Sequence, residues 1–219
     1  DLPIETDARS FITSMLADMP KSKDVSGWLK KCREWRDRYP NVTLDDFKEL
    51  NPYSVSRIIS NEAKERDIIV PESGGNLSWI MQSWEWKRGQ RLVNDFGNSS
   101  MGYSLPAAIG AYFATGRAPI CIAGDGGIQM NIQELQTIVN YKIPIKIFVY
   151  SNEGYGIIRQ FQDLYLGGRH VGTHEGTPDF AKVAEAYGIK AMRIDDVTKV
   201  KAQIKEAMNY NGAILVDIR

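Results

Sequence analysis

Residues 118–127 read Ala118-Pro-Ile-Cys-Ile-Ala-Gly-Asp-Gly-Gly127, an apolar run that passes directly into a glycine-rich turn with one carboxylate. The apolar part is typical of a strand buried on both faces, and we expect Cys121 within it to be a small buried hydrophobic residue. A helical pattern follows over Asn131–Tyr141, and a second apolar run comes next at Ile145–Tyr150. This alternation predicts parallel strands joined by helices.

The same alternation continues outward along most of the chain. It favours a doubly wound α/β fold, with a mainly parallel sheet and helices on both faces. Residues 1–50 are helix-rich and charged, and we interpret them as the tail of a preceding domain plus a linker; residues 51–219 form the predicted α/β domain. The remaining predicted helices are Ala8–Met19, Ser26–Arg38, Tyr53–Lys64, Asn76–Trp84, Leu105–Phe113, Pro178–Tyr187 and Thr198–Tyr210, and the remaining strands are Asp67–Val70, Arg91–Asn94 and Ile214–Ile218.

Composition excludes several classes of function. The 27 basic and 27 acidic residues balance, and they form no basic stripe, so nucleic-acid binding is not expected. The apolar stretches all fall short of the ~18 residues of a membrane span. Two distant cysteines without metal-ligand spacing, and an opening that does not read as a signal peptide, lead us to expect a cytoplasmic protein.

The turn Gly124-Asp-Gly-Gly127 has the composition of a phosphate-binding loop that also uses a metal ion. Glycine lets the backbone approach a phosphate closely, and N–H groups at the start of a helix attract anions. A carboxylate beside a phosphate would repel it unless a divalent cation lay between them. Asp125 therefore indicates Mg²⁺ at this loop.

A second polar loop, Ser151-Asn-Glu-Gly-Tyr-Gly156, follows the next predicted strand. Asn152 lies 27 positions after Asp125, a spacing that accommodates one helix and one strand. A right-handed crossover would bring both side chains to the carboxyl edge of the sheet, where ligands bind in such folds. The Asn152 amide oxygen and the Gly154 carbonyl would then join Asp125 in a set of oxygens suited to Mg²⁺.

This pair resembles the signature of thiamine-diphosphate enzymes, a Gly-Asp-Gly followed some two dozen or more residues later by an Asn. The stretch Asn98-Ser-Ser-Met-Gly-Tyr-Ser-Leu-Pro-Ala-Ala-Ile-Gly-Ala111 is similar to one in acetolactate synthases. The likeness is collinear over roughly residues 50–219 and is more specific for the cofactor than for the substrate. Three further segments resemble that family: Asn131–Gln136, Gln160–Gln162 and Thr177–Gly188.

The resemblance implies the C-terminal thiamine-diphosphate-binding domain of an acetolactate-synthase-like enzyme. It implies that Asp125, Asn152 and the Gly154 carbonyl bind the metal. Met101 would be the large apolar residue that keeps the cofactor bent, and thus the catalytic candidate of this chain. The Ser99 carbonyl and the Met101 N–H would contact the pyrimidine ring. The diphosphate would be held by backbone groups of Gly126, Gly127 and Gly156 and by the loop that contains Gly75 and Asn76.

The resemblance also implies an activity: decarboxylation of a 2-oxo acid and joining of the product to a second carbonyl compound. In this family a Glu from a separate pyrimidine-binding domain of a partner subunit activates the cofactor, and no segment here resembles that domain. We therefore expect the chain alone to be inactive, and the parent protein to be a homo-oligomer that supplies the domain. FAD would belong to a middle domain of the parent and is not expected here.

One departure from the family concerns the substrate. Acetolactate synthases have a Trp where this chain has Phe161, so the wall that selects the second substrate would differ in size and lack an N–H donor. Alternatives are a subunit of a simple decarboxylase of the sulfopyruvate or phosphonopyruvate type, or a non-catalytic cofactor-binding module. A nicotinamide site is disfavoured because no Gly-x-Gly-x-x-Gly follows a predicted strand. We interpret His170 and His174 as solvated loop residues.

Overall fold

The computed structural model describes residues 2–19, 23–174 and 176–219, which separate into two compact units. The first unit, residues 1–40, contains helices α1 (Ala8–Ala17) and α2 (Ser26–Arg38), whose residues are all exposed or half-buried. The Asp7 carboxylate caps α1 by accepting from two backbone N–H groups of its first turn. Both predicted helices are confirmed, and the role of this unit as the tail of a preceding domain stays a prediction.

The second unit, residues 41–219, is built on one six-stranded sheet whose neighbouring strands are all parallel. The strand order is β2-β1-β3-β4-β6-β5. The doubly wound α/β fold is therefore confirmed. The strands are β1 (Ile68–Pro71), β2 (Arg91–Leu92), β3 (Pro119–Gly124), β4 (Lys146–Tyr150), β5 (Lys190–Ile194) and β6 (Ile214–Ile218).

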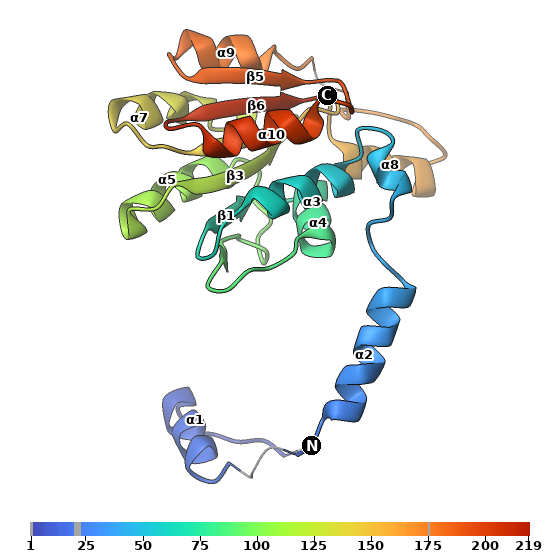
Figure 1. Ribbon diagram of the computed structural model, residues 1–219, viewed down its shortest axis with the longest axis vertical. Helices are drawn as coiled ribbons and strands as arrows, with labels where there is room; N and C mark the ends of the chain where they lie inside the picture. Colours follow the sequence, from blue (N-terminus) through green and yellow to red (C-terminus); the bar gives the residue numbers. More distant parts are fainter. Residues whose placement is uncertain (1, 20–22, 175) are drawn as a thin grey trace. The chain divides into compact units, whose positions relative to one another are not determined.

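Helices cover both faces of this sheet, as Figure 1 shows. Within β3, Ile120 and Ile122 point into one core, whereas Cys121 and Ala123 point into the other, because successive strand side chains alternate between faces. The first core is closed by α3 (Pro52–Glu62), α4 (Gly75–Ser83) and α10 (Val200–Asn209). The second core is closed by α5 (Ser104–Thr115), α7 (Leu135–Asn140) and α9 (Phe180–Ala186).

Several elements differ from the sequence expectation. Strand β5 was not predicted; it is an edge strand with exposed Lys190 and Arg193, so it lacks the continuous apolar run of the central strands. Helix α8 (Gly156–Tyr165) was also not predicted, and all its side chains are exposed or half-buried. The expected helix over residues 131–141 consists of a 3₁₀ turn, η2 (Ile132–Glu134), followed by α7. Two short elements complete the fold, the 3₁₀ turn η1 (Asp45–Phe47) and helix α6 (Asp125–Gln129).

The order of the strands places three loops side by side. β1, β3 and β4 are neighbours near the middle of the sheet, and because they are parallel their carboxyl ends meet at one edge. Residues 72–76, 124–127 and 151–156 all emerge there. Over the described ranges, every helix is too short or too polar to cross a membrane.

Candidate cofactor site

Asp125 follows β3 directly and is buried, with 1% of its surface exposed. Its Oδ1 accepts from the N–H of Gly126 at 2.8 Å, and its Oδ2 accepts from the N–H of Gly154 at 3.2 Å. Burial raises the pKa of this carboxyl above its usual value, and the backbone hydrogen bonds oppose that rise. The carboxylate is thus held between the loop after β3 and the loop after β4, which were predicted to lie side by side.

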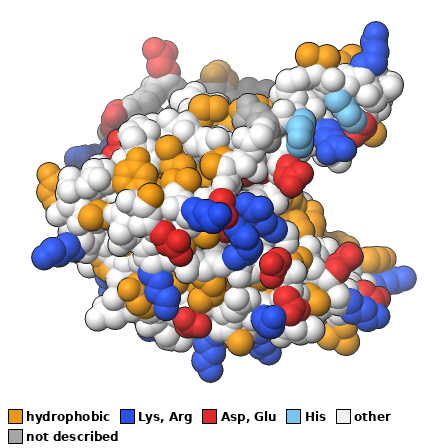
Figure 2. All heavy atoms as spheres, turned by 90° about the horizontal axis from the view of Figure 1, so that it is seen from above, with side chains coloured by type: hydrophobic (Ala, Val, Ile, Leu, Met, Phe, Trp, Pro, Cys, Tyr) orange, Lys and Arg blue, Asp and Glu red, His pale blue; other side chains and the backbone are white. Residues whose placement is uncertain are grey.

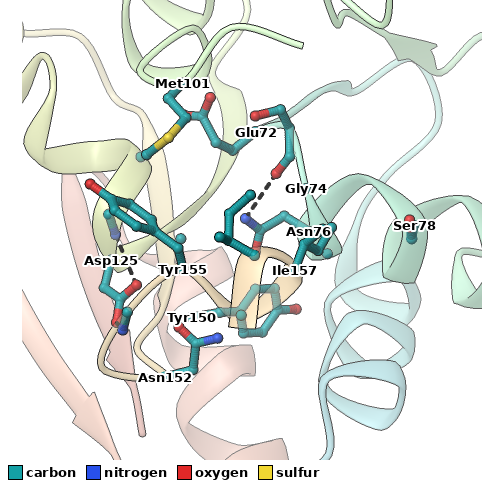
Figure 3. Close-up of a pocket in the computed structure, with 18 of the residues that line it drawn as sticks. Glu72, Gly74, Asn76, Ser78, Met101, Asp125, Tyr150, Asn152, Tyr155 and Ile157 are labelled. Atoms are coloured by element: carbon teal, nitrogen blue, oxygen red, sulfur yellow. Dashed lines mark hydrogen bonds between the residues drawn. The ribbon is translucent and has the colours of Figure 1, made fainter. Parts of the chain in front are cut away.

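Asn152 and Gly154 converge on the same carboxylate. The end atom of the Asn152 amide that faces the turn lies 2.8 Å from the Gly154 carbonyl oxygen and 3.1 Å from Asp125 Oδ1. With nitrogen in that position, the amide donates a hydrogen bond to both oxygens. With oxygen in that position, three oxygens face one another, from Asn152, Gly154 and Asp125. Figure 3 shows the Asn152 and Asp125 side chains beside each other at the cavity.

The second arrangement fits a divalent cation. Mg²⁺ binds oxygens at about 2.0–2.1 Å in an octahedron, which separates adjacent ligands by about 3 Å. The 2.8 and 3.1 Å separations are compatible with that spacing, and they equally fit the hydrogen bonds of the first arrangement. Among the described residues there is no group of three His, Cys, Asp or Glu side chains that could hold a metal. A cation here would therefore need neutral amide and carbonyl oxygens, and anionic oxygens from a ligand.

Glycine is required in this loop by close packing. Gly154 has φ = 150°, and a Cβ placed on it would lie 2.1 Å from the Thr173 carbonyl oxygen. The same carbonyl accepts from the N–H of Tyr155 at 3.0 Å, and Gly154 forms an antiparallel bridge with His174. The segment around Thr173 thus fixes the backbone that presents the Gly154 carbonyl.

The glycines expected at the diphosphate also have close protein neighbours. A Cβ on Gly126 would lie 2.4 Å from the Tyr155 ring, and one on Gly127 would lie 2.8 Å from Cγ of Glu72. A Cβ on Gly156 would lie 2.7 Å from Nδ2 of Asn152. Close approach of backbone to protein side chains therefore explains these glycines in addition to any approach of a phosphate.

The loop after β1 forms the facing wall. Gly74 has φ = 77°, a conformation suited to glycine, and Gly75 begins α4 with its Cα against the Trp79 ring. Asn76 is buried, with Nδ2 donating weakly to the Ser73 carbonyl at 3.4 Å. Its Oδ1 has no hydrogen-bond partner among the described residues. Because buried polar atoms nearly always form a hydrogen bond, we expect a bound water or ligand to donate to this oxygen.

Met101 and Ser99 lie on the loop that precedes α5. Ser99 has φ = 51°, an uncommon conformation for a residue other than glycine, and Met101 is 42% exposed. The Met101 side chain extends toward the Tyr155 ring (Figure 3), and its methyl group would lie 3.5 Å from a Cβ on Gly126. The predicted wedge thus points across the glycine turn.

All the residues predicted to bind cofactor or metal line one cavity of about 860 Å³, within the range of small-molecule sites. Phe161, the residue predicted to select the second substrate, is not among the residues that line this cavity; its ring is half-exposed and packs at a tilt against Tyr165. The described lining from α8 consists of Gly156, Ile157, Ile158 and Gln160. Sequence reasoning missed the aromatic and acidic part of the lining, for which no local motif exists. This part consists of Tyr53, Glu72, Trp79, Tyr150 and Tyr155.

The two histidines lie outside this cavity lining. Both are exposed, and His170 contacts Asp163 on α8 through its Nε2 at 2.6 Å. Figure 2 shows histidine side chains in pale blue at the surface. Their exposure agrees with the solvated-loop interpretation.

Comparisons with known proteins assign the chain to a family. Residues 72–218 match the family model "Thiamine pyrophosphate enzyme, C-terminal TPP binding domain", and the chain therefore belongs to that family (thiamine pyrophosphate is thiamine diphosphate). Within it, the chain is similar to acetolactate synthases. It is 33% identical over 219 residues to the large subunit from Porphyra purpurea, covering 96% of this chain and 37% of that protein.

Two further relatives come from distant organisms. The probable acetolactate synthase large subunit of Methanocaldococcus jannaschii is 36% identical over 229 residues, covering 100% of this chain and 39% of that protein. The mitochondrial acetolactate synthase catalytic subunit of Saccharomyces cerevisiae is 30% identical over 223 residues, covering 99% and 32% respectively. The chain is thus a C-terminal thiamine-diphosphate-binding domain of the acetolactate-synthase-like kind, and it spans less than half the length of these relatives.

Proposed function

We propose that the cavity binds thiamine diphosphate as its Mg²⁺ complex. The convergence of Asp125 Oδ1, the Asn152 amide and the Gly154 carbonyl at separations of 2.8 and 3.1 Å supports this proposal most directly. These three groups would hold the metal, and the metal would neutralise the diphosphate beside a buried carboxylate. Backbone groups of Gly126, Gly127 and Gly156, with the loop of Gly75 and Asn76, would hold the phosphate oxygens.

The remaining half of the cavity would position the reactive part of the cofactor. Met101 would press against it and favour its bent form, while the Ser99 carbonyl and the Met101 N–H would orient the pyrimidine ring. When bound, the cofactor supplies an electron sink for the carbanion left by loss of CO₂ from a 2-oxo acid. The chain's own residues would thus bind, orient and shield, which is the division of work expected for a cofactor enzyme.

The proposed activity of the parent enzyme is decarboxylation of a 2-oxo acid followed by joining to a second carbonyl compound. The chain would need a pyrimidine-binding domain, in the same protein or a separate chain, and the parent would be a cytoplasmic homo-oligomer. The chain's coverage of 32–39% of its relatives supports this dependence. Phe161 would contribute to selection of the second substrate, and FAD would belong to other parts of the parent.

Isothermal calorimetry tests the cofactor assignment. Titration with thiamine diphosphate should show binding in the presence of Mg²⁺ and little binding after addition of a chelator. Asp125→Ala should remove the Mg²⁺ dependence without changing the circular dichroism spectrum. Asp163→Ala is a matched control, because that carboxylate lies on exposed α8. Tight binding that is indifferent to chelator would exclude the metal role.

A second experiment separates the proposed enzyme from a non-catalytic module. The chain alone should release no CO₂ from pyruvate, and addition of a pyrimidine-binding domain from a relative should restore release. CO₂ release without ligation to a second carbonyl compound would favour a simple decarboxylase. Turnover by the isolated chain would contradict the proposed dependence on a second domain.

A further inference from the structure

Glu72 is a buried carboxylate at the edge of the cavity, with 2% of its surface exposed. It follows β1 directly, and its N–H extends the sheet ladder by donating to the Ile122 carbonyl. Its side chain turns away from the sheet toward the start of α5. A buried carboxylate is costly unless it is fully hydrogen-bonded, so its partners indicate its role.

Those partners are the first groups of α5. Glu72 Oε1 accepts from the N–H of Tyr103 at 3.2 Å, and Oε2 accepts from the N–H and the hydroxyl of Ser104 at 3.3 and 2.6 Å. The first amides of a helix have no partner within the helix, and the N-cap residue Tyr103 has no side-chain group suited to capping. Glu72 therefore caps α5 from another element, where the helix dipole also favours a negative charge.

This cap fixes the loop that carries the predicted cofactor contacts. Met101 lies three positions before Ser104, separated by Gly102 with φ = 83°. The Gly102 carbonyl accepts from Asn131 Nδ2 at 2.8 Å, and Asp95 Oδ2 accepts from the N–H of Ser100 at 2.8 Å. Glu72 is a further tether, and it joins the loop to the end of β1.

The methylene stem of Glu72 has a second contact. A Cβ on Gly127 would lie 2.8 Å from Glu72 Cγ and 3.1 Å from Cδ, so the stem packs directly against the glycine turn after β3. One side chain thus touches the turn at the predicted diphosphate and also caps the helix behind Met101. Both carboxylate oxygens are occupied by α5, which argues against a role as a free acid or base.

We propose that Glu72 is a positioning residue, which holds the Ser99–Met101 loop at a fixed distance from the glycine turn. Its consequence for the cofactor rests on the proposed function, whereas its effect on the loop is a property of the chain alone. Loss of the cap should loosen the groups that orient the organic part of the cofactor. It should leave the metal and diphosphate contacts of Asp125 and Asn152 nearly unchanged.

Hydrogen exchange of the 219-residue chain without cofactor tests the effect on the loop. Glu72→Gln keeps the shape of the side chain but removes the charge and replaces one acceptor with a donor. The amides of residues 99–104 should exchange about tenfold faster or more, because the loss of one charge-assisted hydrogen bond should raise the exchange rate of the amides it protects by about one to two powers of ten. Amides of β4 should be unchanged, and Glu206→Gln, at an exposed pair with Lys190, is the matched control.

Calorimetry tests the consequence for the cofactor with two probes, thiamine diphosphate and inorganic diphosphate, both with Mg²⁺. Glu72→Gln should weaken thiamine diphosphate about tenfold and inorganic diphosphate by less than twofold. Equal weakening of both probes, or unchanged exchange at residues 99–104, would overturn the proposal. If the unmodified chain binds neither probe, the proposed function fails, and hydrogen exchange still decides the role of Glu72.

Ser104→Ala provides a second route if Glu72→Gln does not fold. It removes the hydroxyl that donates to Glu72 at 2.6 Å, together with the contact of that hydroxyl with the Cys121 thiol, and keeps both backbone donors. The same amides should then exchange about threefold to tenfold faster, with the same separation between the two probes. Unchanged exchange in a folded Ser104→Ala chain would count against the cap as the element that holds the loop.

Discussion

Substitution of Gly154 by Ala should damage both the fold of the loop and the proposed metal site. The backbone at Gly154 has φ = 150°, which costs a residue with a Cβ about 1–3 kcal/mol. The new Cβ would lie 2.1 Å from the Thr173 carbonyl oxygen, so one backbone segment must move away from the other. That movement breaks the Tyr155–Thr173 hydrogen bond, worth about 1 kcal/mol. If the strain affects the whole folded unit, we expect the free energy of unfolding to fall by ~2–4 kcal/mol in total.

Urea unfolding followed by circular dichroism measures this loss, and calorimetry with Mg²⁺ and thiamine diphosphate measures the site. A segment that relaxes locally would show a smaller change in unfolding free energy and a loss of Mg²⁺-dependent binding. Gly110→Ala is the matched control: Gly110 lies within α5 with no described atom within 4 Å of a new Cβ, so Ala should stabilise by about 0.5–1 kcal/mol. Unchanged stability together with unchanged Mg²⁺-dependent binding in Gly154→Ala would refute this reasoning.

Three further outcomes follow from other residues. Burial lowers the pKa of Lys146 from 10.5 to about 8, so between these pH values the unfolded chain binds more protons than the folded chain. In urea titrations, the unfolding free energy of the natural chain relative to Lys146→Met should therefore be constant below pH 8 and rise by up to ~3 kcal/mol from pH 8 to 10.5. Burial raises the pKa of the Cys121 thiol to about 12, so a thiol reagent should label Cys32 rapidly at pH 8 and Cys121 only after unfolding. Phe161→Trp, on an exposed helix face, should change unfolding free energy by less than ~0.5 kcal/mol while altering the preference for the second substrate in an assembled enzyme.

The central strands could be predicted because they are buried on both faces and therefore consist of apolar residues. Edge strands carry a weaker pattern: β5 has exposed Lys190 and Arg193 on either side of two half-buried residues, and β2 is only two residues long. Helix α8 has apolar residues at helical spacing, at Ile157, Ile158 and Phe161, but its first residue is Gly156 and it has no capping side chain to mark its start. The structure therefore reveals α8 where the sequence pattern did not, and the apolar face of this helix is exposed.

The candidate site was predictable where its residues lie in short motifs after strands. The 27-position spacing of Asp125 and Asn152 corresponds to one crossover, so topology alone brings them to one edge. Glu72 could not be found this way, since its partners lie 31 and 32 positions away on a loop whose path no local pattern specifies. Its importance depends on a three-dimensional contact between a strand end and a helix start.

The Asn152 amide has a consequence for how quickly a metal could enter. Without an ion, the hydrogen bonds favour nitrogen at the end of the amide that faces Asp125 and the Gly154 carbonyl, so this exposed side chain would have to turn over to offer its oxygen to a metal. Rotations of exposed side chains take picoseconds to nanoseconds, far less than the time of loop rearrangements. Binding of an ion would therefore require the rotation of one side chain and no rearrangement of either loop.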